Sequence, residues 1–411
     1  MSVIDYNRLR DIESKIGSPF YIMNPDIYEE NVKAFAAAFR KRYEKFIVGY
    51  SFKTNYVPAL CQRAKQFGCY AEVVSEMEMD LAVSLGFKDI IFNGPIKREK
   101  ALIKAIQLGA IINIDAEYEV DFLCQYHKDN PHEEIKAGLR LNVMLTDKNG
   151  HSVVQNGLRC GRFGFPHNIL SRNIEKLRDV GIKIVSVHGH TSSSDRAVAN
   201  YKVITDYMLR VCEEFSLDDI EFFDIGGGYF GAAPEGLDLT GRPRYEDYAN
   251  IVVDSVGKNS WFNKCRPYIV IEPGSSVVSN VFKYYTKVYQ IKHIGEKNFA
   301  MVDGTVFDVK PTMHSNNLPH VIISDGDNGG EELYDVVGST CMEKDVILKD
   351  VPLKGLRAGD FIELRGVGAY TICLTPTFIN YLAPIVSIEK DGMRMVRRRQ
   401  QLDDILTIYE R

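Results

Sequence analysis

Between residues 45 and 274, short apolar runs alternate with longer segments whose apolar residues recur at helical spacing. The apolar runs are rich in β-branched residues, which is typical of parallel strands buried on both faces. These runs are KFIVGYSFK, GCYAEVVS, KDIIFNG, AIINID, IKAGLRLNV, IKIVSVHGH, EFFDIGG and RPYIVIEPG. Several intervening segments, such as REKALIKAIQLG, end in glycine, which suits the C-terminus of a helix. Eight such units predict a (β/α)8 barrel, because the alternative, a doubly wound sheet, rarely has eight evenly spaced parallel strands.

After residue 275 the pattern changes to β-strands joined by short turns, without intervening helices. The runs are SNVFKYYTKVYQIKHIG, NFAMVDGTV, HVIISD, ELYDVVG and DFIELRG. We therefore assign residues 26–275 to an α/β barrel and residues 276–411 to an all-β domain. The segment SPFYIMN predicts one further strand, so residues 1–25 are assigned as an N-terminal segment that joins the β-domain, with the barrel as the alternative position for this strand.

Composition and charge exclude several classes of partner. The 411 residues include 50 lysines and arginines against 55 aspartates and glutamates, so the net charge of −5 does not favour nucleic acid or an anionic membrane. No stretch approaches the ~20 apolar residues of a membrane span, and the charged N-terminus lacks a signal-peptide core. The eight cysteines are scattered without a CxxC pair, which predicts reduced thiols in a cytoplasmic protein and no zinc site.

The predicted barrel strands carry polar residues at their carboxyl ends, where the active sites of such barrels lie. Lys53 is the first of them, and a buried lysine can lose its proton and act as a nucleophile, although a lone lysine at a strand end is usually solvated. Because the set has no metal-ligand spacing, we predict an organic cofactor and no metal. The remaining members are Glu72, Asn93, Asp115, Arg140, His188, His190, Gly226, Gly227, Gly228 and Glu272.

The segment DIGGGYFG follows the seventh predicted strand, and its glycines allow backbone N–H groups to approach a phosphate. It also fits the dinucleotide pattern GxGxxG, but no helix begins after it, which makes that match weak. A lysine, a phosphate loop and a carboxylate at the last strand together indicate pyridoxal 5′-phosphate (PLP). Lys53 would form the Schiff base, Glu272 would hydrogen-bond the pyridine nitrogen, and the His190 ring could stack on the cofactor.

In this order the motifs resemble those of the PLP-dependent decarboxylases of alanine-racemase fold type, a family that includes diaminopimelate, ornithine and arginine decarboxylases. YSFKTN resembles the PLP-lysine motif, GLRLN the arginine motif and HGHTSSS the HxHxGS stretch. The resemblance implies that Lys53, Glu272, His190 and Cys341 are catalytic. It implies that the cofactor is bound by Lys53, Glu72, Arg140, His190, Ser193, Gly226, Gly227, Gly228, Glu272, Ser275 and Tyr370.

Two motifs of the predicted β-domain belong to the same resemblance. GSTCMEKD resembles the family motif G-P-x-C-E-S-x-D, and GAYT resembles the motif whose tyrosine, here Tyr370, contacts the phosphate. In the family, the cysteine at the position of Cys341 enters the partner subunit's active site and reprotonates Cα. The resemblance therefore implies a homodimer whose active sites are shared across the interface.

The departures from the family pattern fall mainly on the positions that read the distal end of the substrate. Met342 replaces an acidic residue that recognises a distal amine, and in KPTMHSNN, Lys310 replaces an arginine and His314 a tyrosine. In addition, Ser275 stands where the family usually has an arginine that contacts phosphate or substrate. The predicted substrate-binding residues are Lys310, His314, Met342, Glu343 and Asp345.

These departures predict a decarboxylase that acts on an unusual amino acid, diaminopimelate-like or an intermediate of siderophore or secondary metabolism. Diaminopimelate itself is one alternative, and a racemase on the same fold is another. Glu272 favours decarboxylation, because alanine racemases place an arginine at the pyridine nitrogen. A non-catalytic PLP carrier is disfavoured, since carriers of this fold are single short barrels.

Overall fold

The computed structural model describes residues 4–326, 329–389 and 392–410, and these fall into two compact units. The barrel unit comprises Glu29–Gly231 and Gly241–Ser276. The β-domain unit comprises the described residues of Met1–Tyr28, Ala232–Thr240 and Val277–Arg411. The segment Ala232–Thr240, which lies within the predicted barrel region of the sequence, thus belongs to the β-domain unit.

In the described part of the chain, eight parallel strands close into a barrel in chain order, and this confirms the predicted (β/α)8 architecture. Each strand pairs with the next, and the last pairs with the first. Every residue of the first and fourth of these strands is buried, as continuous apolar runs require. The strands are β2 (Phe46–Ser51), β3 (Tyr70–Val73), β4 (Ile90–Phe92), β5 (Ile111–Ile114), β6 (Lys136–Leu141), β7 (Ile184–Gly189), β8 (Phe222–Asp224) and β9 (Tyr268–Ile271).

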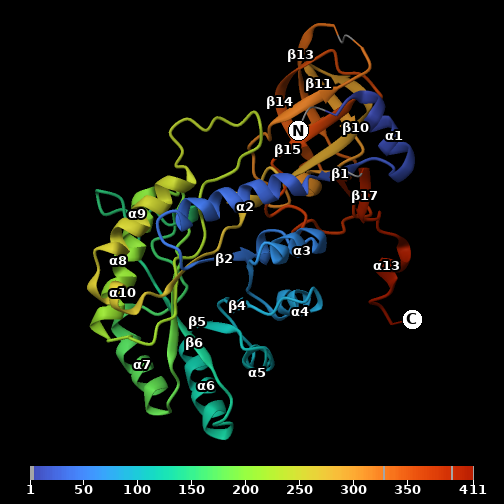
Figure 1. Cartoon of the computed structure of the whole chain (residues 1–411). Helices are drawn as coiled ribbons and strands as arrows, with labels where there is room; N and C mark the ends of the chain where they lie inside the picture. Colours follow the sequence, from blue (N-terminus) through green and yellow to red (C-terminus); the bar gives the residue numbers. More distant parts are fainter. Residues whose placement is uncertain (1–3, 327–328, 390–391, 411) are drawn as a thin grey trace. The chain divides into compact units, whose positions relative to one another are not determined.

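Helices connect the barrel strands, and α6 to α10 lie on the outside of the barrel (Figure 1). Each presents one apolar stripe to the strands; in α7 the buried residues Leu170, Ile174 and Leu177 recur at helical spacing. Among the described residues, no helix is both long and apolar enough to cross a membrane. The helices are α2 (Pro25–Arg40), α3 (Pro58–Gln66), α4 (Glu76–Ser84), α5 (Glu99–Gln107), α6 (Glu117–Asp129), α7 (Leu170–Asp179), α8 (Val198–Glu214), α9 (Tyr245–Gly257) and α10 (Ser260–Cys265).

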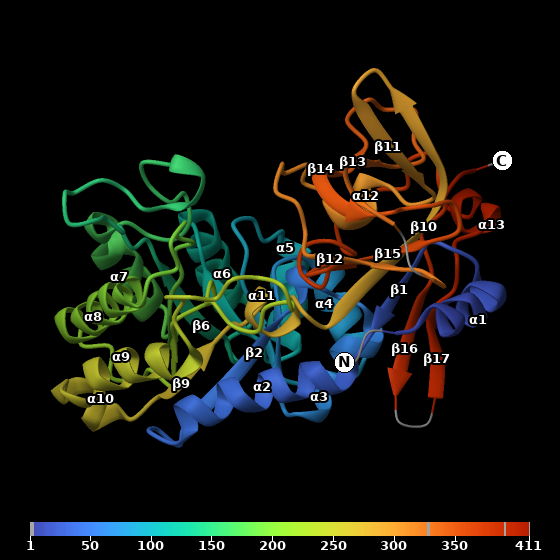
Figure 2. The ribbon, with the colours of Figure 1, turned by 90° about the horizontal axis from the view of Figure 1, so that it is seen from above.

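The β-domain unit is built on a sheet with the strand order β14-β13-β11-β10-β1-β16-β17, to which β15 and β12 are added at β10. Strand β1 pairs with β10 and β16, so the strand predicted from SPFYIMN lies in this sheet. In Figure 2, β16 and β17 form an antiparallel pair. The strands are β1 (Phe20–Met23), β10 (Phe282–Ile294), β11 (Lys297–Val302), β12 (His320–Ile323), β13 (Glu331–Val337), β14 (Val346–Lys354), β15 (Phe361–Arg365), β16 (Ile385–Glu389) and β17 (Gly392–Arg397).

An apolar cluster fixes helix α1 (Tyr6–Ile16) on this sheet. Leu9 and Ile12, one turn apart on the helix, are buried against strand residues that include Phe20, Tyr285 and Phe361. The rings of Phe20 and Tyr285 stack with centroids 5.5 Å apart. The short helices α11 (Ser275–Val278), α12 (Val306–Val309) and α13 (Leu402–Leu406) complete the chain.

Candidate active site

Lys53 and Glu72 form an ion pair at the carboxyl ends of the first two barrel strands. Strand β2 ends at Ser51, and a 3-10 turn (Phe52–Thr54) places Lys53 directly after it. Lys53 Nζ lies 2.6 Å from Glu72 Oε2, which also accepts a hydrogen bond of 2.6 Å from Ser51 Oγ. The Glu72 side chain is buried, whereas that of Lys53 is 35% exposed. Lys53 is therefore an accessible amine held by a buried carboxylate.

Asn93, directly after β4, joins two carboxylates of this site. Its Nδ2 donates to Glu72 Oε1 at 3.0 Å and to Glu272 Oε1 at 2.6 Å. Its Oδ1 accepts a hydrogen bond of 2.9 Å from Asn113, whose own Oδ1 accepts one of 3.0 Å from Ser186. This chain of buried side chains fixes the orientation of the Asn93 amide, so that its hydrogens point to the carboxylates.

The sequence analysis placed Asn93 at the end of a barrel strand but assigned it no role. The available signal lay in the neighbouring strands, because Asn113 and Ser186 are polar residues within otherwise apolar β5 and β7. A polar side chain in the middle of a buried strand needs a hydrogen-bond partner. Asn93 is therefore part of the site that sequence reasoning left unassigned.

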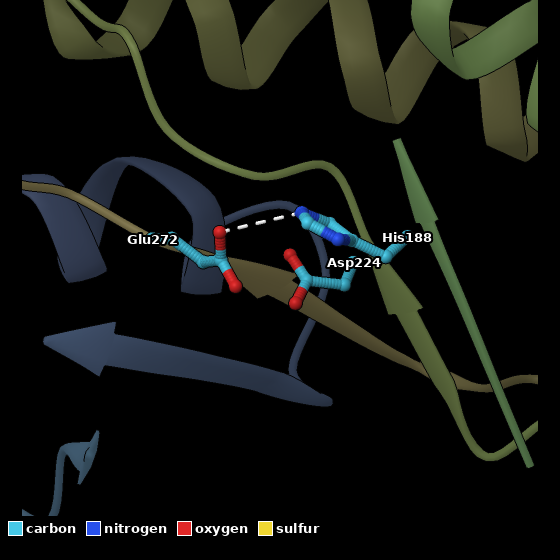
Figure 3. A group of neighbouring side chains, drawn as sticks. All are labelled: His188, Asp224 and Glu272. Carbon is cyan, nitrogen blue, oxygen red and sulfur yellow. Dashed lines mark ion pairs between the residues drawn. The ribbon is translucent and has the colours of Figure 1, made fainter. Parts of the chain in front are cut away.

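Glu272, His188 and Asp224 converge on one point, each from the end of a different barrel strand (Figure 3). His188 Nε2 lies 3.4 Å from Glu272 Oε2, and one ligand atom from each of the three residues falls within 4.8 Å of the others. Burial and the charge of Glu272 raise the pKa of Asp224. Burial also acts to raise the pKa of Glu272, but the charges of His188 and Lys53 outweigh it and hold that pKa well below its usual range. An ionised Glu272 in this position suits a cationic partner, either a metal ion or a protonated ring nitrogen.

The glycine loop after β8 packs against the ring of His190. Gly226 and Gly228 have φ angles of +68° and +91°, and a Cβ at Gly226 would lie 2.5 Å from that of His190. The Gly227 N–H donates to His190 Nδ1 at 3.0 Å, so a neutral ring carries its proton on Nε2. Burial, together with the charge of Arg140, lowers the pKa of His190 to about 3. His190 is therefore neutral at physiological pH.

The remaining predicted barrel residues have protein partners that the sequence did not indicate. Arg140 pairs with Asp115, with Nη1 and Oδ2 3.3 Å apart, and its guanidinium lies 4.6 Å from the ring centroid of Phe163. Ser193 Oγ accepts hydrogen bonds from the backbone N–H of Arg196 (3.1 Å) and from Asn200 Nδ2 (3.0 Å). Ser193 is thus the centre of an ordered turn after β7.

Polar groups of the barrel that lack a hydrogen-bond partner are consistent with PLP binding at this site. Within the ranges that the structure describes, the Gly228 N–H has no protein acceptor and the buried His188 Nδ1 has no hydrogen-bond partner. A phosphate at the glycine loop would accept a hydrogen bond from the Gly228 N–H, and a polar group of the ligand would supply the missing partner of His188 Nδ1. Lys53 and Glu272 supply the amine and the carboxylate that the cofactor requires.

The cysteine motif of the β-domain forms a turn between β13 and β14. Cys341 and Glu343 are exposed there, and Met342 is partly buried. Asp345 is buried, and its two oxygens accept hydrogen bonds from the backbone N–H groups of Val306 (2.7 Å) and Thr340 (2.9 Å). Both oxygens of Asp345 thus hold the turn that presents Cys341, which favours a positioning role over direct contact with substrate.

Lys310 follows helix α12 and is a buried lysine with a side chain that forms no ion pair among the described residues. Burial lowers its pKa. Partial burial and the charge of Lys310 also lower the pKa of the nearby His314. Tyr370 follows β15 with a φ of +52° and is 43% exposed. These residues all belong to the β-domain unit.

Residues 29–279 match the family model described as pyridoxal-dependent decarboxylase, pyridoxal binding domain. The chain therefore belongs to the family of PLP-dependent decarboxylases, and PLP is its cofactor. Diaminopimelate decarboxylase from Aquifex aeolicus is 24% identical, over 97% of this chain and 93% of the relative. The enzyme of the same name from Archaeoglobus fulgidus is 26% identical, over 97% and 94% respectively.

Solved structures agree on the fold. The diaminopimelate decarboxylase of M. jannaschii in complex with L-lysine has a TM-score of 0.86 at 24% identity, covering 98% of this chain and 94% of that one. An arginine decarboxylase from Paramecium bursaria Chlorella virus has a TM-score of 0.75 at 21% identity, covering 91% and 97%. With the family established, the protein is a PLP-dependent amino-acid decarboxylase, a carboxy-lyase.

Proposed function

We propose that the protein is a diaminopimelate decarboxylase, which removes one carboxylate of this diamino diacid as CO2. The observation that carries this substrate is the similarity, over nearly the full length of both chains, to enzymes of that name from Aquifex aeolicus and Archaeoglobus fulgidus. Diaminopimelate is therefore the first substrate to test, ahead of the unusual amino acid that the sequence analysis predicted. The buried Lys310, without an ion-pair partner among the described residues, supports it, because an ammonium in this state suits a carboxylate ligand such as the distal one of diaminopimelate.

In the barrel, Lys53 would hold the cofactor and Glu272 would keep its ring nitrogen protonated. When bound, PLP supplies the electron sink that stabilises charge left at Cα after the carboxylate departs. Glu272 suits this role because its pKa is held low and Asn93 fixes its carboxylate. The neutral His190 ring can pack on the cofactor without adding charge.

The same carboxylate favours decarboxylation over racemisation. A protonated ring nitrogen withdraws more charge from Cα than a neutral one, and an ionised carboxylate keeps that nitrogen protonated. An arginine in place of Glu272 would leave that nitrogen unprotonated. We therefore propose that decarboxylation, and not racemisation, is the main reaction.

For the β-domain we propose that Cys341 returns a proton to Cα in the active site of a partner subunit, which makes the active form a homodimer with shared sites. The exposed position of Cys341 on a turn held by Asp345 supports this role. Tyr370 would contact the phosphate and Lys310 the distal carboxylate. His314, Met342 and Glu343 would line the distal end of the substrate.

A second candidate is a diaminopimelate-like amino acid that keeps the distal carboxylate but lacks the distal amine. Met342 favours it, because a thioether offers no charge to an ammonium group where the family motif has an acidic residue. Lys310 would bind the distal carboxylate of either substrate.

The test is release of CO2 from three amino acids: diaminopimelate, lysine, which lacks the distal carboxylate, and aminopimelate, which lacks the distal amine. We expect kcat/KM to be highest for diaminopimelate and lowest for lysine. In a Lys310→Met variant, kcat/KM should fall for both diacids and change little for lysine. A preference for aminopimelate would establish the second candidate, and exchange of the Cα proton without CO2 release would contradict both.

A further inference from the structure

Arg196 is a cation beside the glycine loop that no ion pair neutralises within residues 4–326, 329–389 and 392–410. Its Nη1 lies 3.4 Å from the carbonyl oxygen of Tyr229, directly after the glycines, and 3.4 Å from Oγ of Ser275, the first residue of α11. The side chain is half-buried. A partly buried guanidinium with only two long contacts to neutral oxygens is left short of acceptors, which indicates an anionic ligand.

The surrounding structure holds Arg196 in a backbone conformation that L-residues rarely adopt. Its φ is +47°. The backbone N–H donates to Ser193 Oγ, and the backbone carbonyl accepts a hydrogen bond of 2.7 Å from the hydroxyl of Tyr248. The guanidinium also lies 5.3 Å from the ring centroid of Phe230. These contacts fix the direction of the side chain toward the glycine loop, as a preorganised binding group requires.

We propose that Arg196 binds the phosphate of PLP. Arginine matches phosphate oxygens with two parallel N–H groups, which makes it a strong phosphate ligand. The contact between Arg196 and Ser275 supports the assignment, because the resemblance placed an arginine at position 275 in related enzymes. Here the positive charge comes from the turn after β7, and its guanidinium lies against the serine that replaces that arginine. The proposal concerns cofactor binding and is independent of which amino acid is the substrate.

The experiment compares the Kd of the apoprotein for PLP with its Kd for pyridoxal, which lacks the phosphate. We expect Arg196→Gln to raise the Kd for PLP by about 10- to 100-fold, as loss of a charge-assisted hydrogen bond implies, and to leave the Kd for pyridoxal nearly unchanged. Arg242→Gln is the matched control. Arg242 lies 5.2 Å from the centroid of the same Phe230 ring but is exposed, so its removal should alter neither Kd appreciably.

A double variant, Arg196→Gln with Ser275→Arg, should recover most of the affinity for PLP, because it returns a guanidinium to the same place. Circular dichroism and the Tm of each apoprotein show whether the variants fold. If Arg196→Gln does not fold, Arg196→Lys, which keeps the charge, takes its place. Equal losses for PLP and pyridoxal, or equal losses in the Arg196 and Arg242 variants, would overturn the proposal. So would an unchanged Kd for PLP with a raised KM for the amino acid, which would assign Arg196 to the substrate carboxylate.

Discussion

The side-chain amide of Asn93 lies 2.6 Å from Oε1 of Glu272, and both residues are buried. A neutral hydrogen-bond donor therefore fixes this carboxylate while leaving its negative charge in place. The charge would be partly cancelled if a lysine or arginine held Glu272 instead. The contact thus orients Glu272 for a cationic partner and leaves its negative charge in place.

We predict that Asn93→Asp lowers kcat and moves the acid limb of the pH profile to higher pH. The new carboxylate would lie against both Glu72 and Glu272, and like charges raise the pKa of a carboxyl group. The measurement is kcat/KM between pH 5 and 9. Asn113→Ala, which removes only the support behind Asn93, is the control and should shift the profile less. An unshifted acid limb in Asn93→Asp would show that a carboxylate at position 93 does not raise the pKa of Glu272.

The role proposed for Glu272 predicts a larger effect on kcat than on cofactor affinity. In Glu272→Gln the ring nitrogen would lose the anion that keeps it protonated, so the cofactor, when bound, would withdraw less charge from Cα. A loss of ~10²-fold in kcat would correspond to about 2.7 kcal/mol of transition-state stabilisation. Single-turnover CO2 release and the Kd for PLP together test this. A Kd that rises as much as kcat falls would assign Glu272 to binding alone.

Lys53 is expected to be the residue that holds the cofactor covalently. Reduction of the holoprotein with borohydride should fix the label on the peptide that contains Lys53, as mass spectrometry would show. Lys53→Ala should lose the yellow colour on dialysis, whereas Lys88→Ala, which removes an exposed lysine, should keep it. A label found on any other lysine would refute the assignment.

Glu78 gives a prediction for stability. Burial is the largest cause that raises its pKa, to about 7, and the charge of Glu72 adds to it. Because the folded state binds this proton more tightly than the unfolded state, the contribution to stability is complete below the ordinary carboxyl pKa and is lost as pH rises to about 7. The difference amounts to up to about 3 kcal/mol.

We expect Glu78→Gln to remove this dependence, since the amide can still accept the hydrogen bond of 2.7 Å from the Val74 N–H. The free energy of unfolding should be measured in denaturant at pH 5 and pH 7.5. Glu76→Gln, in the same helical turn, is the control and should retain the wild-type slope. Parallel profiles for Glu78→Gln and the wild type would contradict the prediction.

The barrel strands could be predicted from the sequence because each is a separate apolar run with a helix after it. The assignment of Ala232–Thr240 to the β-domain unit could not, since contacts between residues remote in sequence decide it. One of these is the ion pair of 3.1 Å between Glu235 and Arg365. A polar loop segment carries no periodicity that would reveal such a partner.

The candidate site, too, could be predicted only in part from the sequence. Strand order alone places Lys53, Glu72 and Glu272 at one end of the barrel, because all parallel strands end there. Which side chains touch depends on strand register and rotamers. The bridge made by Asn93 and the guanidinium of Arg196 beside Ser275 were therefore visible only in three dimensions.

Our last prediction is that the active site is shared between two subunits. Lys53 belongs to the barrel unit and Cys341 to the β-domain unit. We propose that the motif around Cys341 completes the site of the partner subunit. Lys53→Ala and Cys341→Ala should each be inactive as homodimers. After mixing and subunit exchange, a mixed dimer carries one site with both wild-type residues.

With random reassociation of equal amounts, half of the dimers are mixed and each has one intact site, so about a quarter of the wild-type activity should return. The thiol of Cys341 suits the role because a thiol carries a proton that it can donate to a neighbouring atom. Mixing Lys53→Ala with Glu272→Gln is the control, since both residues lie in one barrel and no mixed dimer has an intact site. Exchange demonstrated by mass spectrometry without any recovery in the first mixture would place Lys53 and Cys341 in the same subunit's site.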